Sequence, residues 1–308
     1  MIFVDILHRQ YLLHQNSPLH ITTTASVRIT LLTVLPFLDS YSYEVLLLKI
    51  KTIALATMAI SVSHTAYADQ APNQDTLLEQ GSKNSSSVQL YGAEVYSHEK
   101  VLFGKFVIRM KMVSHPGVVS SFFTYDNESW QGSVPWREID IEALGKTPNT
   151  LQTNLITGMA NQRVHSERTE TIPNLNDFHE YTLTWTPDAI TWLLNGEMLH
   201  QELASKSQQV IDMRDSPQSY RMNIWISEAI AWVGKFDAST LPLTQEVDWI
   251  EYYRYHDGEF VLDWRDDFNS FDSKRWGKGD WTFDSNLVTF SQNNAYIEND
   301  KLILKLSK

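Results

Sequence analysis

The chain has 308 residues, no cysteine and a formal net charge of -12 at pH 7. This charge argues against nucleic acid and anionic polymers as partners, because phosphate and sulfate groups are bound by patches of Lys and Arg. Without cysteine no disulfide can hold the fold, and the redox compartment is left open. A neutral partner or substrate fits the composition best.

Residues 45–68 carry the pattern of a secretory signal peptide. Lys49 and Lys51 precede the apolar run 53–62, and Ala66-Tyr67-Ala68 is a small-x-small cleavage signature. The run is too short to span a bilayer as a stable anchor, although an N-terminal membrane anchor is the alternative. We therefore predict cleavage after Ala68 and export to the periplasm or the medium.

The segments on either side of this signal differ from it. Signal peptides begin a few residues before their charges, so residues 1–44 do not fit, and we expect translation to begin near Val45 or Leu46. Residues 69–88 are polar and rich in Ser, Asn and Gln, which predicts a flexible lead-in. The folded domain is expected over residues 89–308.

Within this domain nearly every segment alternates between apolar and polar residues, as strands do. In 105–112 the even-numbered residues are apolar, and 181–185 and 302–306 alternate in the same way. Asn195-Gly196 is the pair that a two-residue hairpin loop prefers, and 256–259 is interpreted as a hinge. The pattern predicts one all-β sandwich of two antiparallel sheets.

The stretch 136–145 is the most informative part of the chain. A strand places alternate residues on opposite faces, so three acids share one face and three apolar residues the other: Glu138, Asp140 and Glu142 against Ile139, Ile141 and Ala143. Adjacent like charges repel each other, which is unusual on a purely structural strand. The structural alternative is a solvated outer face, where acids normally alternate with Lys or Thr.

Two of these acids suit hydrolysis of a glycosidic bond with retention, in which one glutamate attacks as a carboxylate and the other donates a proton. On an extended strand the Cα atoms of Glu138 and Glu142 lie about 13 Å apart. Retention needs carboxyl groups about 5–5.5 Å apart, so the side chains must lean toward each other over Asp140. Asp140 would hydrogen-bond the attacking group, and its charge would help keep the acid protonated.

The Glu-Ile-Asp-Ile-Glu run resembles the signature of glycoside hydrolase family 16, whose members are jelly-roll sandwiches with a concave cleft. This resemblance implies that Glu138 is the nucleophile, Asp140 a helper and Glu142 the acid/base. Further segments resemble bacterial lichenases, the mixed-linkage β-1,3-1,4-glucanases, and extend the likeness over residues 89–308: 151–154, 177–181, 192–196, 221–225, 231–234 and 247–250.

The order of the segments resembles the circularly permuted lichenases. Residues 260–308 look like the segment that opens an ordinary lichenase, and Trp276-Gly277-Lys278-Gly279-Asp280-Trp281 matches the permuted subgroup. The hinge at 256–259 would then join the two former termini, which commonly lie close together in a sandwich.

The resemblance also implies a set of cleft residues, because aromatic faces stack on sugars while amides and Arg bind hydroxyls. They are Phe123, Tyr125, Asn127, Gln152, Asn154, Glu167, Arg221, Asn223, Trp225, Trp232, Lys278, Asp280 and Trp281. Core packing is the alternative for any single aromatic residue, and we expect Trp192 and Trp249 in the core. The loop 128–134 departs most from the family pattern.

The implied activity is that of a secreted endo-β-glucanase, which cleaves β-1,4 bonds in mixed-linkage β-1,3-1,4-glucan with a neutral-to-mildly acidic optimum. Pure β-1,3-glucanases of the family usually carry an extra residue that bulges the acidic strand, and this chain has no insertion. A β-1,3-glucanase acting on laminarin and a non-catalytic glycan-binding sandwich remain alternatives.

Hydrolysis of this kind needs no cofactor, and we expect a monomer that binds polysaccharide, without nucleic acid or a stable membrane anchor. No His or acid cluster in the sequence has metal-ligand spacing. Family members often hold a structural calcium through backbone and Asp oxygens, which leaves little trace in a sequence.

Overall fold

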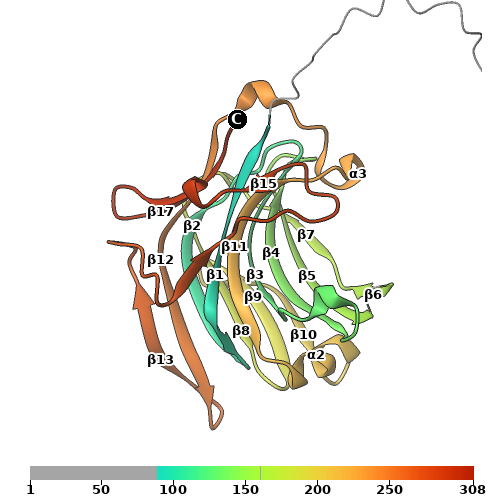
Figure 1. Cartoon of the computed structure of the whole chain (residues 1–308). Helices are drawn as coiled ribbons and strands as arrows, with labels where there is room; N and C mark the ends of the chain where they lie inside the picture. The colour runs from blue at the N-terminus through green and yellow to red at the C-terminus, as the bar shows by residue number, and fades with distance from the viewer. Residues whose placement is uncertain (1–88, 160) are drawn as a thin grey trace, which may run out of the picture. The chain divides into compact units, whose positions relative to one another are not determined.

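The alternating segments of the sequence become the strands of two sheets that pack against each other across one hydrophobic core (Figure 1). The computed structural model describes residues 89–159 and 161–308. The expected extension at 1–44, the signal peptide at 45–68 and the lead-in at 69–88 lie outside the described residues. The predicted all-β sandwich is confirmed, and every strand pair is antiparallel except β1 with β15.

The first sheet has the order β14-β1-β11-β3-β4-β5-β6, with β15 beside β1 and β7 beside β5. Its strands are β1 (Tyr91–Val101), β3 (Val118–Tyr125), β4 (Trp136–Leu144), β5 (Thr150–Met159), β6 (Gln162–His165), β7 (Arg168–Thr171), β11 (Gln218–Ile226), β14 (Trp276–Lys278) and β15 (Thr289–Phe290). The acidic stretch is therefore β4, an interior strand between β3 and β5.

The second sheet has the order β10-β9-β8-β2-β12-β17-β16, with β13 beside β12. Its strands are β2 (Gly104–Lys111), β8 (His179–Trp185), β9 (Ala189–Leu194), β10 (Glu197–Leu203), β12 (Leu243–His256), β13 (Glu259–Asp266), β16 (Ala295–Ile297) and β17 (Leu302–Leu306).

Helices are short in this domain. They are η1 (Ser129–Gln131), α2 (Gln208–Asp212), η2 (Met213–Asp215), α3 (Ile230–Val233), η3 (Ala238–Thr240) and η4 (Gln292–Asn294). None of the helices in 89–159 and 161–308 has the length and apolar character needed to cross a bilayer.

The predicted alternation of apolar residues is what fills the core. Phe106, Ile108 and Met110 of β2 are buried, and Ile139 and Ile141 of β4 meet the same cluster from the opposite sheet. The acidic strand thus buries its apolar face and turns its carboxylates away from the core, as the period of two predicts. Asn195 and Gly196 have φ values of 50° and 83°, which confirms the hairpin between β9 and β10.

The predicted hinge at 256–259 is wrong. His256 pairs with Glu259, so β12 and β13 form a hairpin. Asp257 and Gly258, with φ values of 50° and 86°, are its two turn residues. Asp-Gly is a favoured pair for such a turn because both positions need positive φ. The segment therefore holds two strands in fixed register.

The two tryptophans expected in the core are split by the structure. Trp192 on β9 is 1% exposed, which confirms the prediction. Trp249 on β12 is partly exposed, and the guanidinium of Arg265 lies 4.3 Å from its ring. The pairing of β12 with β2 shifts register between Val247 and Trp249. This bulge adds a residue between two buried positions and turns the indole outward.

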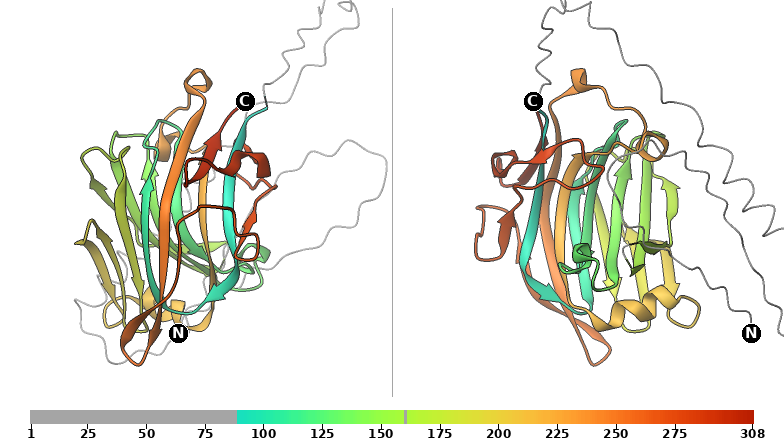
Figure 2. Two further views of the ribbon diagram at one scale, coloured as in Figure 1. Left: turned by 90° about the vertical axis from the view of Figure 1, so that its left-hand side faces the viewer. Right: turned by 45° about the vertical axis from the view of Figure 1, so that its right-hand side comes forward.

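The C-terminal segment is built into both sheets, with β14 and β15 in the first and β13, β16 and β17 in the second. In both views of Figure 2 the C-terminal segment (red) lies beside β1 (teal). The backbone amides of Tyr91 and Ser307 each donate to the other residue's carbonyl oxygen at 2.9 Å. The two ends of the described domain are therefore hydrogen-bonded neighbours, while a permuted order of segments stays a prediction.

Candidate active site

The three acids of β4 lie on the face of the first sheet that points away from the core, here named the carboxylate face. β4 pairs with β3 and β5 in an uninterrupted register. Glu138 therefore lies opposite Tyr125 and Ile156, Asp140 opposite Phe123 and Asn154, and Glu142 opposite Ser121 and Gln152. Side chains directly opposite each other share a face, so the register alone gathers aromatic rings, amides and carboxylates in one place.

Two polar links through the core hold this part of the sheet in position. The indole Nε1 of Trp192 donates to the backbone carbonyl of Asp140 at 3.0 Å, which fastens β4 to β9 of the opposite sheet. The Ser120 hydroxyl donates to Gln245 Oε1 at 2.7 Å, and the amide of Gln245 returns a bond to the carbonyl of Ser121 at 3.1 Å. Buried polar groups that are paired in this way specify one arrangement of a core.

The groups around Glu138 partly offset the effect of desolvation on its pKa. Desolvation raises the pKa of Glu138 to about 7, while hydrogen bonds from Trp136 and Asp140 and the charges of Arg221 and Arg163 act against that rise. The indole Nε1 of Trp136 donates to Glu138 Oε2 at 2.6 Å. A carboxyl group that receives such donors is stabilised in its ionised form.

Glu142 has no such donors, and it is the stronger candidate for a proton carrier. Burial, together with the charges of Glu138 and Glu167, raises the pKa of Glu142 to about 8. Near neutral pH the arrangement therefore favours an ionised Glu138 and a protonated Glu142, which are the states that a nucleophile and a general acid need.

Asp140 lies between the two glutamates, and its surroundings favour the neutral form of its carboxyl group. Burial and the charges of Glu138 and Glu142 raise the pKa of Asp140 well above its usual range. The hydrogen bond between Asp140 and Glu138 lowers the pKa of Glu138 and raises that of Asp140, so Asp140 is the donor. The expected hydrogen bond is present, while the expectation that a charge on Asp140 helps to keep Glu142 protonated stays a prediction.

A network of buried polar groups continues from the acids across β11 to β1. Arg221 Nη1 donates to Glu94 Oε1 at 2.6 Å, and its Nη2 donates to Asn127 Oδ1 at 2.7 Å. Asn223 donates to Glu94 Oε2 at 3.3 Å and accepts from the hydroxyl of Ser121 at 2.7 Å. Burial raises the pKa of Glu94, and the Arg221 charge opposes that rise. Three residues expected from the sequence, Asn127, Arg221 and Asn223, are thereby connected.

The other side of β4 is lined by amides. Asn154 Oδ1 accepts from the backbone amide of Ser166 at 3.1 Å, and Gln152 Oε1 accepts from the indole of Trp232 at 3.3 Å. A cavity of about 350 Å³ lies at this end, lined by Gln152, Trp232 and several threonines of β5 and β7. Glu167, in the turn between β6 and β7, adds its charge to Asp140 and Glu142.

Aromatic rings stand at both ends of the carboxylate face. The ring centroids of Trp225 and Trp232 lie 6.2 Å apart, and those of Tyr96 and Trp281 lie 5.4 Å apart. Gly277 on β14 permits the second pair, because a Cβ at this position would lie 2.3 Å from the Tyr96 ring. Flat rings flanking polar groups are typical of a surface that binds sugars.

Two expected cleft residues are not gathered with the others. Lys278 lies opposite Val95, a core residue, and on the same face of β14 as the buried Trp276; its ammonium sits 4.5 Å from the centre of the Phe271 ring. The expected role of Lys278 in lining the cleft stays a prediction. Asp280 is exposed in the loop after β14, where its carboxylate accepts from Gln292 at 3.4 Å.

Sequence reasoning missed several residues of this site: Glu94, Tyr96, Ser121, Trp136 and Arg163. Glu94 and Tyr96 share the face of β1 opposite the buried Ala93 and Val95, which is a weak signal for a second polar strand. Trp136 directly precedes the acidic run, and its position two residues before Glu138 on one strand face would have suggested contact.

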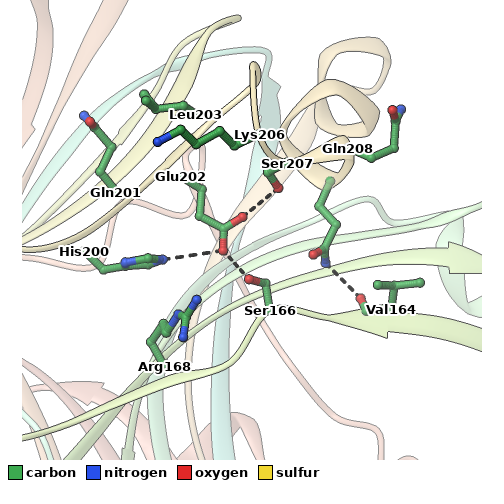
Figure 3. Close-up of a pocket in the computed structure, with 11 residues that line it drawn as sticks. Val164, Ser166, Arg168, His200, Gln201, Glu202, Leu203, Lys206, Ser207 and Gln208 are labelled. Carbon is green, nitrogen blue, oxygen red and sulfur yellow. Dashed lines mark hydrogen bonds and ion pairs between the residues drawn. The ribbon is translucent and has the colours of Figure 1, made fainter.

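A larger cavity, of about 490 Å³, lies away from the three acids, between β6, β7, β10 and α2 (Figure 3). Its buried acid, Glu202, accepts hydrogen bonds from Ser166 and Ser207 and faces His200 Nε2 at 3.5 Å. These contacts fasten β10 to the β6–β7 connection and use the oxygens of Glu202, so this carboxylate has a structural role.

No group of three or more His, Asp or Glu side chains within the described part of the chain is placed to hold a metal ion. The structural calcium that the resemblance allows, held through backbone and Asp oxygens, stays a prediction.

Comparison with known proteins gives a consistent result. A family model described as glycosyl hydrolases family 16 matches residues 57–251. A β-glucanase of Fibrobacter succinogenes is 43% identical over 234 residues, which are 73% of this chain and 66% of that protein. A β-glucanase of Brevibacillus brevis is 34% identical over 174 residues, which are 55% of this chain and 63% of that protein.

Among solved structures, a β-glucanase of Bacillus licheniformis has 29% identity and a TM-score of 0.44, with 53% of this chain and 71% of that chain covered. The chain spans about two thirds of the length of the first curated relatives that it matches.

Proposed function

The chain belongs to glycosyl hydrolases family 16, and we propose that it is an endo-β-glucanase that cleaves mixed-linkage β-1,3-1,4-glucan with retention. Glu138 is the proposed nucleophile, Asp140 its helper and Glu142 the acid/base. The observation that carries this proposal is the difference between the two glutamates: Glu138 accepts a hydrogen bond from the indole of Trp136, while the half-buried Glu142 lies beside the charges of Glu138 and Glu167.

In the first proposed step a carboxylate oxygen of Glu138 attacks the anomeric carbon of the sugar. The bond from this carbon to the glycosidic oxygen breaks, and Glu142 gives its proton to the leaving oxygen. The product is an ester between Glu138 and the sugar. Glu142, now ionised, then takes a proton from water, whose oxygen attacks the same carbon and releases Glu138.

Asp140 and Trp136 support the charge changes on Glu138 in this scheme. Both donate hydrogen bonds to its carboxylate before the attack. They orient the attacking oxygen, and they stabilise the carboxylate again when it leaves in the second step.

The proposed sugar-binding surface contains the expected residues that surround the acids: Phe123, Tyr125, Asn127, Gln152, Asn154, Glu167, Arg221, Asn223, Trp225, Trp232 and Trp281. We add Glu94 and Tyr96, which contact Arg221. Stacking on rings and hydrogen bonds to amides suit a neutral polysaccharide.

The regular register of β4 supports mixed-linkage glucan over laminarin as the substrate. β4 pairs residue for residue with β5 from Trp136 to Leu144 and with β3 from Glu138 to Leu144. A bulge in this strand, which the resemblance associates with β-1,3-glucanases, would re-aim one glutamate relative to the other.

The deciding experiment is an assay of reducing ends released from barley β-glucan and from laminarin, with Glu138→Gln as the matched control. We expect release from barley β-glucan by the parent alone, with the β-anomer as the first product detected by NMR. Greater release from laminarin would show a β-1,3-glucanase instead. Binding of either glucan without release would show a non-catalytic glycan-binding protein.

We also propose a permuted order of segments, supported by the hydrogen-bonded pair Tyr91 and Ser307. A chain in which Lys308 is joined to Gln89 by a short linker and new ends are opened between Asp257 and Gly258 should fold and keep its activity, because the joined ends are adjacent. Circular dichroism and the same assay would test this, and an unfolded product would contradict it.

Export after Ala68 remains a proposal too, since the signal lies outside the described residues. Sequencing of the mature N-terminus should give Asp69.

A further inference from the structure

One aromatic side chain near the acids is not used by the proposed site. Trp130 is 71% exposed, the highest value among the large apolar side chains of residues 89–159 and 161–308. It lies in the loop 128–134, which departs most from the family pattern. Exposing an indole to water is unfavourable, so its position calls for an explanation.

The turn that carries Trp130 is firmly held, although the indole is exposed. Ser129 is buried, its backbone amide donates to the carbonyl of Asp126 at 2.9 Å, and its hydroxyl donates to the carbonyl of Pro135 at 3.2 Å. The same hydroxyl accepts from the backbone amide of Arg137 at 3.2 Å. Gly132, with a φ of 73°, ends the turn. The structure thus presents the indole from a fixed backbone.

This turn borders the nucleophile's end of the carboxylate face. The backbone of Trp130 hydrogen-bonds the Tyr125 hydroxyl, and Tyr125 lies opposite Glu138. The Tyr125 ring lies 5.3 Å from that of Trp136, which donates to Glu138. The backbone of Trp130 therefore contacts a side chain that lies directly opposite the nucleophile on the neighbouring strand.

The same loop is tied to the polar network of the proposed site. Asn127, three residues before Trp130, accepts from Arg221 at 2.7 Å and from the Ser219 hydroxyl at 2.6 Å. The carboxylate face therefore continues into the loop through amide, hydroxyl and aromatic groups, the mixture that binds neutral sugars.

We propose that Trp130 forms an outer sugar-binding subsite, in which its indole stacks on a glucosyl ring of the β-glucan chain beyond the sugars held over the acids. This inference rests on the proposed function and extends it. An indole in the loop beyond Tyr125 contacts only a sugar chain long enough to extend past the sugars over the acids. Trp130 then contributes to the binding of long chains and not of short ones.

The test is calorimetric binding in the Glu138→Gln background, so that the sugars are not cleaved. Mixed-linkage oligosaccharides of increasing length, from trisaccharide upward, are titrated into this protein and into its Trp130→Ala and Trp130→Tyr variants. Met198→Ala is the matched control, because Met198 is 63% exposed on the second sheet, away from the acids.

We expect Trp130→Ala to weaken binding of the longest oligosaccharides about fivefold or more, as truncating a contacting Trp does, and to leave trisaccharide binding unchanged. Trp130→Tyr should retain most of the affinity, and Met198→Ala all of it. If Trp130→Ala weakens binding equally for oligosaccharides of every length, the substitution acts by disturbing Tyr125. If it weakens binding at no length, the indole does not contact the sugar chain. Either result overturns the proposal.

Failure of the proposed function would look different. The parent would then release no reducing ends, whether or not its Glu138→Gln variant binds glucan. The parent could instead hydrolyse the polymer while Trp130→Ala leaves glucan binding unchanged and weakens binding to another protein. The exposed indole would then belong to a protein interface, and the subsite would be refuted.

Discussion

The outer faces of the two sheets both carry acids, but the three acids of β4 lack the ion pairs that the acids of the second sheet make. On the second sheet Asp248 and Glu246 of β12 each lie 3.0 Å from a cationic nitrogen of β2, and Glu251 lies 2.7 Å from Arg265. We name this surface, formed by β2, β12 and β13, the paired face. On the carboxylate face, none of the ion pairs between described side chains involves the three acids of β4.

This difference distinguishes a solvated structural surface from one whose acids can transfer protons. Exposed ion pairs keep both partners charged at neutral pH and contribute little to stability. Acids that are withdrawn from water and make no ion pair favour the neutral, protonated state, and burying them lowers the stability of the fold. The alternative of a solvated structural face describes the paired face well, and it does not describe β4.

The largest effect should be on catalysis. We expect Glu138→Gln and Glu142→Gln each to lower kcat/KM on barley β-glucan at least about a thousandfold, because a nucleophile and a general acid are lost. The control is Asp248→Asn on the paired face, which should leave kcat/KM within about twofold because exposed pairs contribute little. A comparable loss of kcat/KM in Asp248→Asn would show that the substitutions lower activity by disturbing the fold.

The next effect concerns the buried ion pair at the edge of the carboxylate face. Arg221→Met should lower the free energy of unfolding by about 3 kcal/mol, because Glu94 then loses its cation while it stays buried. Arg109→Met removes a partner from the paired face and should cost less than about 1 kcal/mol. Urea unfolding measures both, and equal values would remove the distinction between the two faces.

Glu142 and Glu251 should show opposite effects of pH on stability. The folded pKa of Glu142, about 8, lies above its ordinary 4.5. The stability that the protonated Glu142 contributes is therefore complete below about pH 4.5 and is lost as pH rises through 8, so Glu142→Gln should be the more stable variant at alkaline pH.

The pKa of Glu251 is lowered, since bonds from Tyr253 and Arg265 outweigh the opposing effect of burial. Its stabilisation is present at neutral pH and is lost in acid, so Glu251→Gln should be the less stable variant above its ordinary pKa. Thermal unfolding of both variants and the parent at pH 5 and 9 tests these opposite changes in stability. If raising the pH changed the stability of both variants relative to the parent in the same direction, the opposite pKa shifts of Glu142 and Glu251 would be contradicted.

The smallest effect is on the pH profile of kcat/KM. Activity needs an ionised Glu138, with a pKa of about 7, and a protonated Glu142, with a pKa of about 8. We expect a bell with its maximum between these values and a fall of about tenfold per pH unit outside them. This shifts the optimum to the alkaline side of the neutral-to-mildly acidic range expected from the sequence.

An aryl glycoside whose leaving group needs no proton should lose only the alkaline limb of this profile. A profile that is flat from pH 4 to 9 would contradict both assignments.

Most of the fold could be predicted from the sequence, because strand alternation and turn pairs are local signals. Asn195-Gly196 specified its hairpin, and the even-numbered residues of 105–112 entered the core. The predictions fail at two places, where a turn signal has a second interpretation and where the tertiary structure overrides strand alternation. Asp257-Gly258 is a turn pair that was interpreted as a hinge, and a bulge in β12 moved Trp249 to the surface.

The candidate site was less predictable because its contacts join distant segments. Glu94 and Arg221 are separated by 127 positions and meet only because β1 and β11 pair. The sequence shows a lone acid in an alternating strand, and only the register places that acid against a guanidinium. Lys278 is a further example, since only the pairing of β14 with β1 shows that it lies opposite the core residue Val95.

The sequence by itself determined that Glu138, Asp140 and Glu142 share one face of a strand, since a strand repeats every two residues. Only the tertiary structure decided their protonation states, because these depend on burial, on the indole of Trp136 and on the field of Arg221. It likewise decided that Asp140 is the donor in its bond to Glu138. Spacing is a local property of the chain, whereas a pKa depends on every group packed around the acid.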